Sequence, residues 1–315
     1  MDVKKVINGV VLSLVFLGVF FVVVQTAWEA GSSNKLFFLG SISGTQKETE
    51  DSEAKTQVQI PSAPYRKWEI RELDLSAESG IVVEANFDEQ EKILYSKNGY
   101  MKLPIASITK LMTAVVAIEN YNLLQNIKIK ISEEAFLQEG NPGKLTAEMG
   151  LTANDLLYIM LIESNNTAAL ALSEGMDKFD FVRLMNEKAR ALSMGNTFFL
   201  EPTGLAPENV STSFDLIKLT KYILNYHPEI SQISRLKEYE LANYGILINT
   251  DELLGEVPEI VVGKTGFTLE AKGCLLLTLK NPREDGYLFY VVLGADDRFS
   301  EMKKMIEWAN TAYQW

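Results

Sequence analysis

A serine and a lysine separated by two residues form the first pattern in this sequence that could do chemistry, Ser107-Ile108-Thr109-Lys110. Residues three apart lie on one face of a helix, so the lysine amine can approach the serine hydroxyl. A helix N-terminus also favours the negative charge that develops on an attacking serine oxygen. Lysine can accept the serine proton if burial or neighbouring cations lower its pKa. The pattern therefore predicts a serine nucleophile, Ser107, with Lys110 as its base.

Histidine and cysteine are almost absent, which narrows the other mechanisms. The chain of 315 residues holds one histidine, His227, and one cysteine, Cys274, so it cannot build a Cys/His zinc site. A Ser-His-Asp mechanism would have to use His227, which precedes Pro228 at a predicted helix end and is expected to be a surface or capping residue. Cys274 lies in an apolar strand and is expected to be a small buried side chain. The net charge of −12 opposes binding to nucleic acid.

Two further polar motifs lie where side chains can reach a cleft. Ser164-Asn165-Asn166 falls at a predicted turn between two apolar helices. Lys264-Thr265-Gly266 is the one K-T-G of the sequence and lies in a strand-like run, where glycine often marks close approach of backbone or ligand. Each motif alone is weak, because S-x-x-K begins at five serines and S-x-N at three. Their combination is more specific than any one of them.

The segments that must position these motifs change between strand and helix periodicity. Helices are predicted over 106–121, 177–192, 213–226 and 300–313, and an N-cap over 152–155. Strands are predicted over 80–85, 92–97, 259–267, 273–280 and 287–295. The short turn at 281–286 predicts that the last two strands form an antiparallel hairpin. Strands at both ends predict an α/β (α+β) fold: one mixed, mainly antiparallel sheet flanked by helices, with a helical lobe inserted.

The first 64 residues differ in composition from the rest. Residues 6–28 carry no charge and are long enough to cross about 30 Å of hydrocarbon, with lysines before them and Glu29 after them. We therefore expect a single-pass transmembrane anchor over 1–28 with its start in the cytoplasm; a cleaved signal peptide is the alternative. The charged and proline-containing residues 29–64 predict a flexible stalk. Residues 65–315 would then form one catalytic domain outside the cytoplasmic membrane.

The motifs S-x-x-K, S-x-N and K-T-G follow one another at residues 107, 164 and 264. Such a set resembles the penicillin-binding proteins and class A β-lactamases. The sequence is most similar to the serine D-Ala-D-Ala carboxypeptidases, the low-molecular-mass penicillin-binding proteins of the β-lactamase/transpeptidase-like superfamily. The resemblance spans about residues 75–315 and extends beyond the motifs, in stretches such as LPIASITKLMTA (103–114) and VVGKTGFTLEAKGCLLL (261–277).

This resemblance implies catalytic roles for residues of the first two motifs. Ser107 would be the acylated nucleophile. Lys110 would be its base, or part of a proton network with Ser164 and Lys264. The sequence departs from the family at Asn165, where the carboxypeptidases commonly have glycine.

The resemblance also implies a set of substrate-binding residues. They are Asn166 for the peptide, Lys264, Thr265 and Gly266 for the strand that holds the terminal carboxylate, and Phe267, whose backbone N–H would form the oxyanion hole with that of Ser107. Several relatives have histidine or tyrosine at the position of Phe267. Arg298 resembles the basic residue near the carboxylate, although a surface arginine at a helix start is an equal alternative.

The implied activity is removal of the terminal D-Ala from peptidoglycan stem peptides ending in D-Ala-D-Ala. β-Lactams would be covalent inhibitors, and the chemistry needs no metal or cofactor. One alternative is a class A-like β-lactamase with Glu201 as its deacylation residue, but NTFFLEPTGL (196–205) resembles the carboxypeptidase segment instead. The other is a catalytically silent peptidoglycan-binding protein, which the retained reactive side chains oppose. Hydrolysis and transpeptidation are not separated by the sequence.

Overall fold

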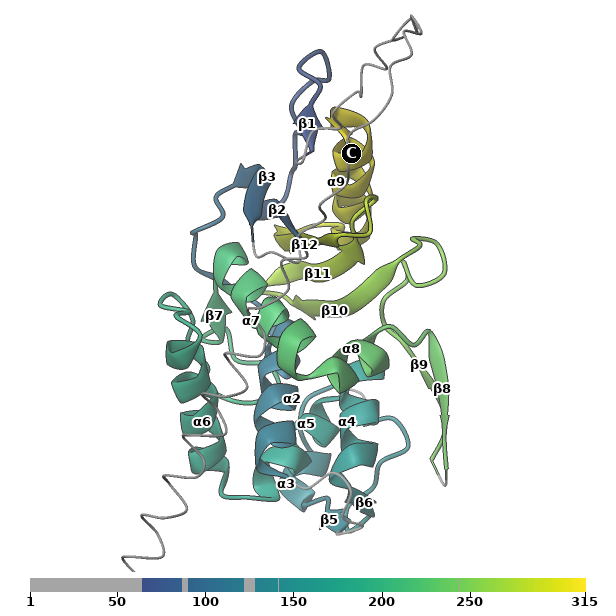
Figure 1. Cartoon of the computed structure of the whole chain (residues 1–315). Coiled ribbons are helices and arrows are strands. Elements are labelled where there is room, and N and C mark those ends of the chain that lie inside the picture. Colours follow the sequence, from purple (N-terminus) through teal and green to yellow (C-terminus); the bar gives the residue numbers. More distant parts are fainter. Residues whose placement is uncertain (1–63, 87–89, 122–127, 141, 243) are drawn as a thin grey trace, which may run out of the picture. The chain divides into compact units, whose positions relative to one another are not determined.

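The computed structural model describes residues 64–86, 90–121, 128–140, 142–242 and 244–315 (Figure 1). All of these residues belong to one compact unit of the chain, Ile60–Trp315. The predicted anchor and all but the last residue of the predicted stalk lie outside the described residues. Within the described ranges, no helix combines the length and the hydropathy needed to cross a bilayer.

The centre of this unit is an antiparallel sheet of five described strands in the order β10-β11-β12-β2-β3. Their bounds are Ile260–Thr268, Lys272–Lys280, Gly286–Ala295, Ser79–Asn86 and Glu91–Lys97. β12 pairs with β2, which confirms that the N- and C-terminal strands meet in one sheet. β11 and β12 form the predicted antiparallel hairpin. β10 is at one edge of these five strands and carries the K-T-G motif there.

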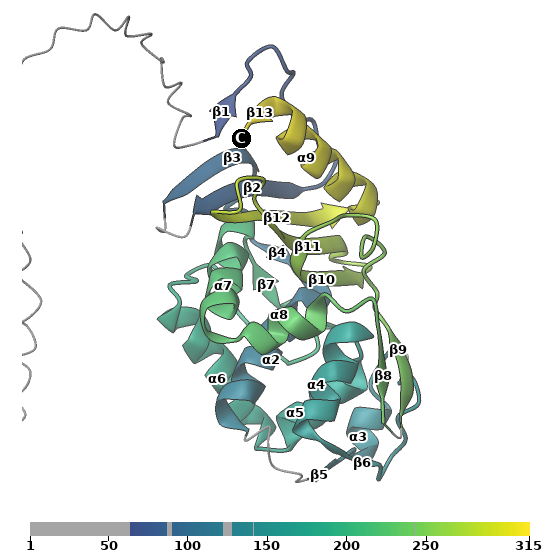
Figure 2. The same ribbon diagram turned by 45° about the vertical axis from the view of Figure 1, so that its right-hand side comes forward.

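The two faces of the sheet are buried against different layers because side chains alternate along each strand. On β11, Leu275 and Leu277 belong to one hydrophobic cluster and Leu276 to the other. The first cluster contains Trp308 and Met305 of α9 (Arg298–Ala312). The second contains the helical lobe. Figure 2 shows α9 on one side of the sheet and α7 and α8 on the other.

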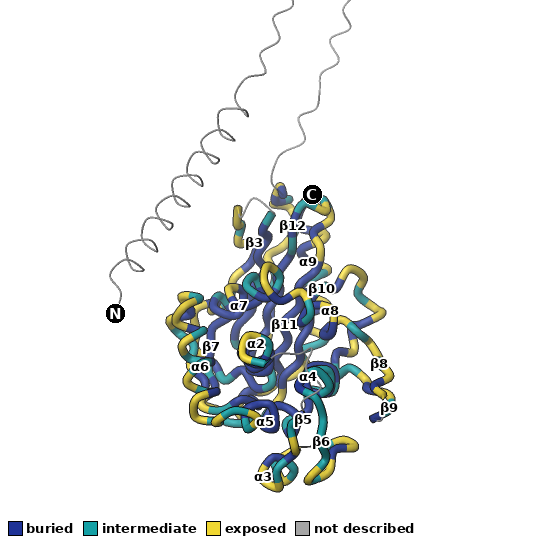
Figure 3. Tube along the Cα trace, turned by 60° about the horizontal axis from the view of Figure 1, so that its bottom comes forward, coloured by how far each residue is buried: buried dark blue, intermediate teal, exposed yellow. Residues whose placement is uncertain are grey.

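The helical lobe is inserted between β3 and β10, as the sequence predicts. Its helices are η1 (Ala106–Ile108), α2 (Thr109–Asn120), α3 (Glu133–Phe136), α4 (Ala153–Ile162), α5 (Asn166–Glu174), α6 (Lys178–Ala191), α7 (Ser213–Tyr226) and α8 (Pro228–Ser234). Thr152 and Asp155 form a reciprocal capping box at the start of α4, which confirms the predicted N-cap. Every residue of α2 from Thr109 to Ala117 is buried, so α2 is the core helix of the lobe. Figure 3 views α2 end-on among the other helices, with its exposed end toward the reader.

Short two-stranded pairings tie the remaining segments together. They are β1 (Tyr65–Arg66) with β13 (Tyr313–Gln314), β4 (Leu103–Pro104) with β7 (Val210–Ser211), β5 (Lys128–Lys130) with β6 (Gly150–Thr152), and β8 (Glu238–Leu241) with β9 (Gly245–Ile248). The β4–β7 pair has a direct consequence for the site. It fixes the segment immediately before η1 against the segment that follows residues 201–206.

Candidate active site

Ser107 lies in η1, a 3₁₀ helix of one turn, directly before α2 begins at Thr109. Its side chain is partly exposed, whereas its neighbours Ala106 and Ile108 are buried. Ala106 has φ +47°, a left-handed conformation that costs a non-glycine residue on the order of 1–2 kcal/mol. Gly204 lies against the Ala106 carbonyl, so close that a Cβ there would be 2.0 Å from the oxygen. The backbone before Ser107 is therefore held in a strained and tightly packed turn.

Lys110 presents its amine to Ser107 from the first turn of α2. Its Nζ lies 2.8 Å from Ser107 Oγ, 2.6 Å from Asn166 Oδ1 and 2.6 Å from the Thr203 carbonyl oxygen. The side chain is fully buried. Burial lowers the pKa of Lys110 from its ordinary value to about 7, and the Glu201 carboxylate opposes that shift.

The geometry around Lys110 suits a base that takes a proton from Ser107. An ammonium group has three N–H donors, one for each of the three described partners of Nζ. A neutral amine has two N–H donors and one lone pair. When these two donors remain on Asn166 and Thr203, the lone pair faces the Ser107 hydroxyl.

Lys264 forms a second buried lysine site with Ser164. Its Nζ donates to Ser164 Oγ at 2.8 Å and to the Thr265 carbonyl oxygen at 3.0 Å. Burial lowers the pKa of Lys264 well below its ordinary value, and the charges of Lys110 and Arg298 lower it further. The two lysines therefore act on one another electrostatically, but the structure pairs each with a different serine.

The turn between α4 and α5 presents the middle motif. Ser164 has φ +56°, so the chain reverses at this residue. Asn165 is the N-cap of α5 and accepts a hydrogen bond from the Ala168 N–H at 2.9 Å. The asparagine side chain therefore has a structural role here as a helix cap. Asn166 accepts from Lys110 and donates from Nδ2 to the Glu139 carbonyl at 2.8 Å, so it joins the lysine to the 139–140 loop.

Gly266 allows the β10 backbone to approach the nucleophile. A Cβ at this position would lie 3.0 Å from the Ser107 nitrogen and 3.0 Å from the Ile105 carbonyl oxygen. The next residue, Phe267, has an exposed side chain. The backbone of Gly266 therefore lies beside the backbone nitrogen of Ser107, and Phe267 follows it along β10.

Two further polar side chains lie at this strand: Thr265, which belongs to β10, and Arg298, which comes from α9. Thr265 Oγ1 lies 2.6 Å from Thr250 Oγ1. Arg298, the first residue of α9, donates from Nη1 to the Gly266 carbonyl at 3.2 Å, and burial lowers its pKa. Arg298 thus starts a helix, which fits a surface arginine at a helix start. Its guanidinium nevertheless lies against the K-T-G strand, which fits a basic residue near the substrate carboxylate.

Some parts of this arrangement have no signal in the sequence. Thr203 takes part through its backbone carbonyl oxygen. Thr250 takes part through its hydroxyl, which contacts Thr265 of β10. The sequence singles out Glu201 only as the deacylation residue of the β-lactamase alternative. In the structure its carboxylate accepts from the backbone N–H groups of Thr203, Gly204 and Ala206.

The lone histidine and cysteine lie away from this cluster. His227 is the cap residue between α7 and α8, which confirms the helix end and the capping alternative; it is buried, so the surface alternative is wrong. Its Nε2 lies 3.2 Å from Glu119 Oε1, and Glu119 is 12 residues beyond Ser107, about 18 Å along the helix. Cys274 is buried as expected, and burial raises the pKa of its thiol to about 11.

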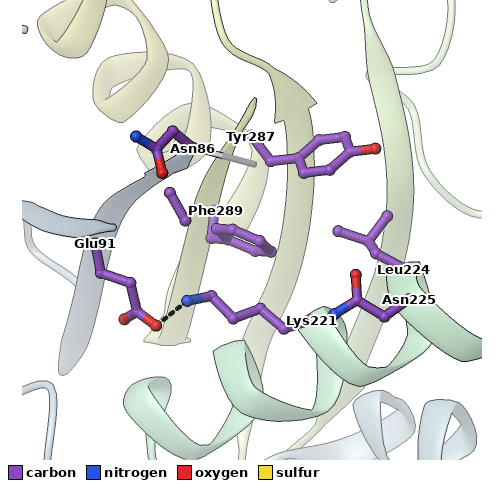
Figure 4. Close-up of a pocket in the computed structure, with 8 residues that line it drawn as sticks. Asn86, Glu91, Lys221, Leu224, Asn225, Tyr287 and Phe289 are labelled. Atoms are coloured by element: carbon purple, nitrogen blue, oxygen red, sulfur yellow. Dashed lines mark hydrogen bonds and ion pairs between the residues drawn. The ribbon is translucent and has the colours of Figure 1, made fainter. Parts of the chain in front are cut away.

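A cavity of about 300 Å³ lies between α7 and the sheet, and Figure 4 shows Lys221 reaching Glu91 across it. No residue of the three motifs lines this cavity. Within the described ranges, no group of three or more His, Cys, Asp or Glu side chains is placed to hold a metal ion.

Comparison with known proteins places the chain in a family. Residues 65–297 match the family model described as D-alanyl-D-alanine carboxypeptidase. The D-alanyl-D-alanine endopeptidase of Pseudomonas aeruginosa is 35% identical over 248 residues, covering 76% of this chain and 78% of the relative. The carboxypeptidase DacF of Bacillus subtilis is 31% identical over 255 residues, covering 77% of this chain and 64% of the relative.

A solved structure agrees with these matches. Penicillin-binding protein D2 of Listeria monocytogenes, in its cefotaxime-bound form, has a TM-score of 0.65 and 29% identity, covering 76% of this chain and 98% of its own. The fold is therefore that of the penicillin-binding proteins and transpeptidases. The chain belongs to the D-alanyl-D-alanine carboxypeptidase family, and by that membership it is a serine peptidase, a hydrolase.

Proposed function

We propose that this enzyme removes the terminal D-Ala of peptidoglycan stem peptides through an acyl-enzyme on Ser107. Lys110 takes the Ser107 proton while Oγ attacks the carbonyl carbon of the penultimate D-Ala. The amide bond breaks, the departing D-Ala amine receives a proton, and a water molecule then hydrolyses the ester. The family membership supports the reaction class, and the 2.8 Å contact between Lys110 Nζ and Ser107 Oγ carries the assignment of nucleophile and base.

The surroundings of Ser107 fit a substrate that ends in a carboxylate. The chain has a net charge of −12, so binding an anionic terminus requires local positive charge. Lys264 and Arg298 bring cationic groups to the K-T-G strand, and Thr265 adds a hydroxyl. The backbone N–H groups of Ser107 and Phe267 are assigned to the developing oxyanion, where fixed donors stabilise charge formed in the transition state. The side chain of Asn166 is assigned to the substrate peptide, and Ser164 with Lys264 to proton transfer.

Mass spectrometry after penicillin treatment tests the nucleophile. We expect one covalent adduct on Ser107 in the wild-type protein and none in Ser107→Ala. β-Lactams are the chosen probe because a relative of this fold has been solved with cefotaxime bound. An adduct at another serine, or one that persists in Ser107→Ala, would refute the site. Rapid release of hydrolysed penicillin would favour the β-lactamase alternative instead.

A second activity, D-Ala endopeptidase cleavage, is favoured by the name of the Pseudomonas aeruginosa relative. Both activities break an amide bond that follows a D-Ala carbonyl, so the same nucleophile and base serve both. Incubation with a pentapeptide and, separately, with a cross-linked peptide dimer distinguishes them. Faster release of D-Ala from the pentapeptide supports the carboxypeptidase; faster cleavage of the dimer supports the endopeptidase.

For its location, we propose a single-pass protein of the cytoplasmic membrane with the catalytic domain on the outer side. The uncharged run at residues 6–28 and the charged stalk that follows support this proposal. Fractionation of cells that produce the full chain tests it. We expect the protein in the membrane fraction and protease-accessible from outside; recovery of the processed protein in the medium would show that the segment is a cleaved signal.

A further inference from the structure

One peptide unit bridges the partly buried carboxylate of Glu201 and the amine of Lys110. The carbonyl oxygen of Thr203 accepts from Lys110 Nζ at 2.6 Å. The N–H of the same peptide unit belongs to Gly204, and it donates to Glu201 Oε1 at 2.6 Å. The negative carboxylate therefore polarises the peptide group whose oxygen faces the lysine. Hydrogen bonds linked in this way strengthen one another inside a protein.

The Glu201 carboxylate accepts hydrogen bonds from several donors of its own loop. Oε1 also accepts from the Ala206 N–H at 3.3 Å and from Asn209 Nδ2 at 2.9 Å, and Oε2 accepts from the Thr203 N–H at 2.6 Å. With the Gly204 contact, Oε1 accepts from three donors and Oε2 from one, and all four donors belong to residues 203–209. These four hydrogen bonds fix the orientation of the carboxylate within its own loop.

The same loop is anchored on both sides of the nucleophile. Thr113 of α2 donates from Oγ1 to the Pro202 carbonyl at 2.6 Å. Gly204, at φ +91°, rests against the Ala106 carbonyl, where any Cβ would collide with backbone. Asn209 Nδ2 also lies 3.2 Å from Thr109 Oγ1. A shift of this loop would consequently move the Thr203 oxygen relative to Lys110.

We infer that Glu201 is a positioning residue for the catalytic base: it holds the Thr203–Gly204 peptide unit against Lys110 and stabilises the ammonium that forms when Lys110 takes the Ser107 proton. The inference rests on the proposed function, because it requires Lys110 to be that base. Glu201 acts through the peptide and touches neither substrate nor the reacting atoms.

The sign of the effect on Lys110 follows from the charges that face it. On the β10 side, the charges of Lys264 and Lys110 repel each other. Arg298 lowers the pKa of Lys264 as well, whereas Asp251 raises it. On the loop side, Glu201 favours the ammonium form and raises the pKa of Lys110. Asn166, from α5, is neutral.

Beyond Glu201 lies a cavity of about 530 Å³ that Lys178 and Glu134 also line, and these two side chains form an ion pair with each other at 2.7 Å.

The experiment compares Glu201→Gln with wild type in the full-length protein, using the rate of acylation by penicillin from pH 5 to 9. Removing the carboxylate charge destabilises the Lys110 ammonium. We expect the midpoint of the rising limb to move down by roughly 0.5 to 1 pH unit, and the plateau rate to fall by about tenfold as the peptide loses its anchor. Glu208→Gln is the matched control, because Glu208 is exposed in the same segment; its profile should equal that of wild type.

Other outcomes separate this inference from the proposed function. A profile of Glu201→Gln that overlays wild type, or a rate that falls equally at every pH, overturns the inference, since a merely structural residue does not move the midpoint. Glu201→Asp keeps the charge and should restore the wild-type midpoint with a reduced plateau. If Glu201→Gln does not fold, an undiminished plateau in Glu201→Asp overturns the inference. Absence of any Ser107 adduct in the wild-type protein instead overturns the proposed function, and the inference with it.

Discussion

Lys110 shows how burial sets the chemistry of a single residue. Its amine lies in a site without solvent exposure, where loss of hydration disfavours the charged form. The partners Asn166 and Thr203 offer acceptor oxygens rather than carboxylates, so they orient the amine without fixing a full opposite charge next to it. Ser107 and Asn166 are partly exposed, whereas Lys110 and Thr203 are buried. In the proposed mechanism, the base is therefore shielded from water while the nucleophile stays within reach of substrate.

The first prediction concerns pH. Because Lys110 must be neutral to accept a proton and its pKa is lowered to about 7, the acylation rate should rise through pH 7 and level off above it. Lys110→Arg should lower the plateau by roughly 10²- to 10⁴-fold, since a guanidinium stays protonated. Stopped-flow acylation with a chromogenic β-lactam measures both. Lys102→Arg, at an exposed lysine of the same segment, should match wild type. A pH-independent rate would contradict Lys110 as the base.

At the scale of elements, the site depends on how closely η1 and β10 can approach. Residues 105–107 lie against Gly266, and the β4–β7 pair fixes the chain just before η1. Both contacts involve main chain, which cannot rotate away as a side chain can. A small residue at position 266 is therefore required by packing, in addition to any role in substrate binding.

Gly266→Ala tests this packing. The new Cβ would sit 3.0 Å from the Ser107 nitrogen, so β10 must shift away from the nucleophile. We expect acylation to fall by on the order of 10²-fold, with a loss of stability of about 1–3 kcal/mol from overpacking. Gly195→Ala serves as the control, because a Cβ there meets nothing within 4 Å. Acylation kinetics and urea unfolding of both variants decide the matter; normal acylation by Gly266→Ala would show that the approach is not needed.

At the scale of the whole described unit, the ends of the catalytic body are brought together. β1 pairs with β13, and α9 packs on the outer face of the sheet opposite the helical lobe. Trp308 is central to this layer: its Nε1 donates to the Arg71 carbonyl at 3.0 Å, and the Arg66 guanidinium lies 5.2 Å from its ring centroid. The layer that supports the sheet is thus distant in sequence from the nucleophile but belongs to the same folding unit.

Trp308→Ala should therefore reduce stability without altering the catalytic groups. Loss of a buried tryptophan typically costs about 3–5 kcal/mol. Trp68→Ala should cost less than about 1 kcal/mol, because Trp68 is 78% exposed. Urea unfolding gives both free energies, and penicillin acylation of the folded fraction reports on the site. Equal losses in the two variants would show that α9 does not support the sheet as described.

Local patterns in the sequence are enough to predict the helices and strands and the reactive side chains that each of them carries. Helix periodicity placed Ser107 and Lys110 on one turn, and strand periodicity placed Lys264 and Thr265 on one strand, because local backbone geometry repeats every few residues. The pairing of the first and last strands followed from the order of elements. The assignment of Arg298 remained open, since a helix start is compatible with either of its alternatives.

Only the tertiary structure decided which groups meet. Lys110 contacts Thr203 across 93 residues, and Lys264 contacts Ser164 across 100. No local period encodes such contacts, and Thr203 takes part through a backbone oxygen that every residue type possesses. From the sequence, Glu201 is a candidate only as the deacylation residue of a β-lactamase. Its place beside the Thr203–Gly204 peptide, and so its link to Lys110, exists only because the folded chain brings that loop against the start of α2.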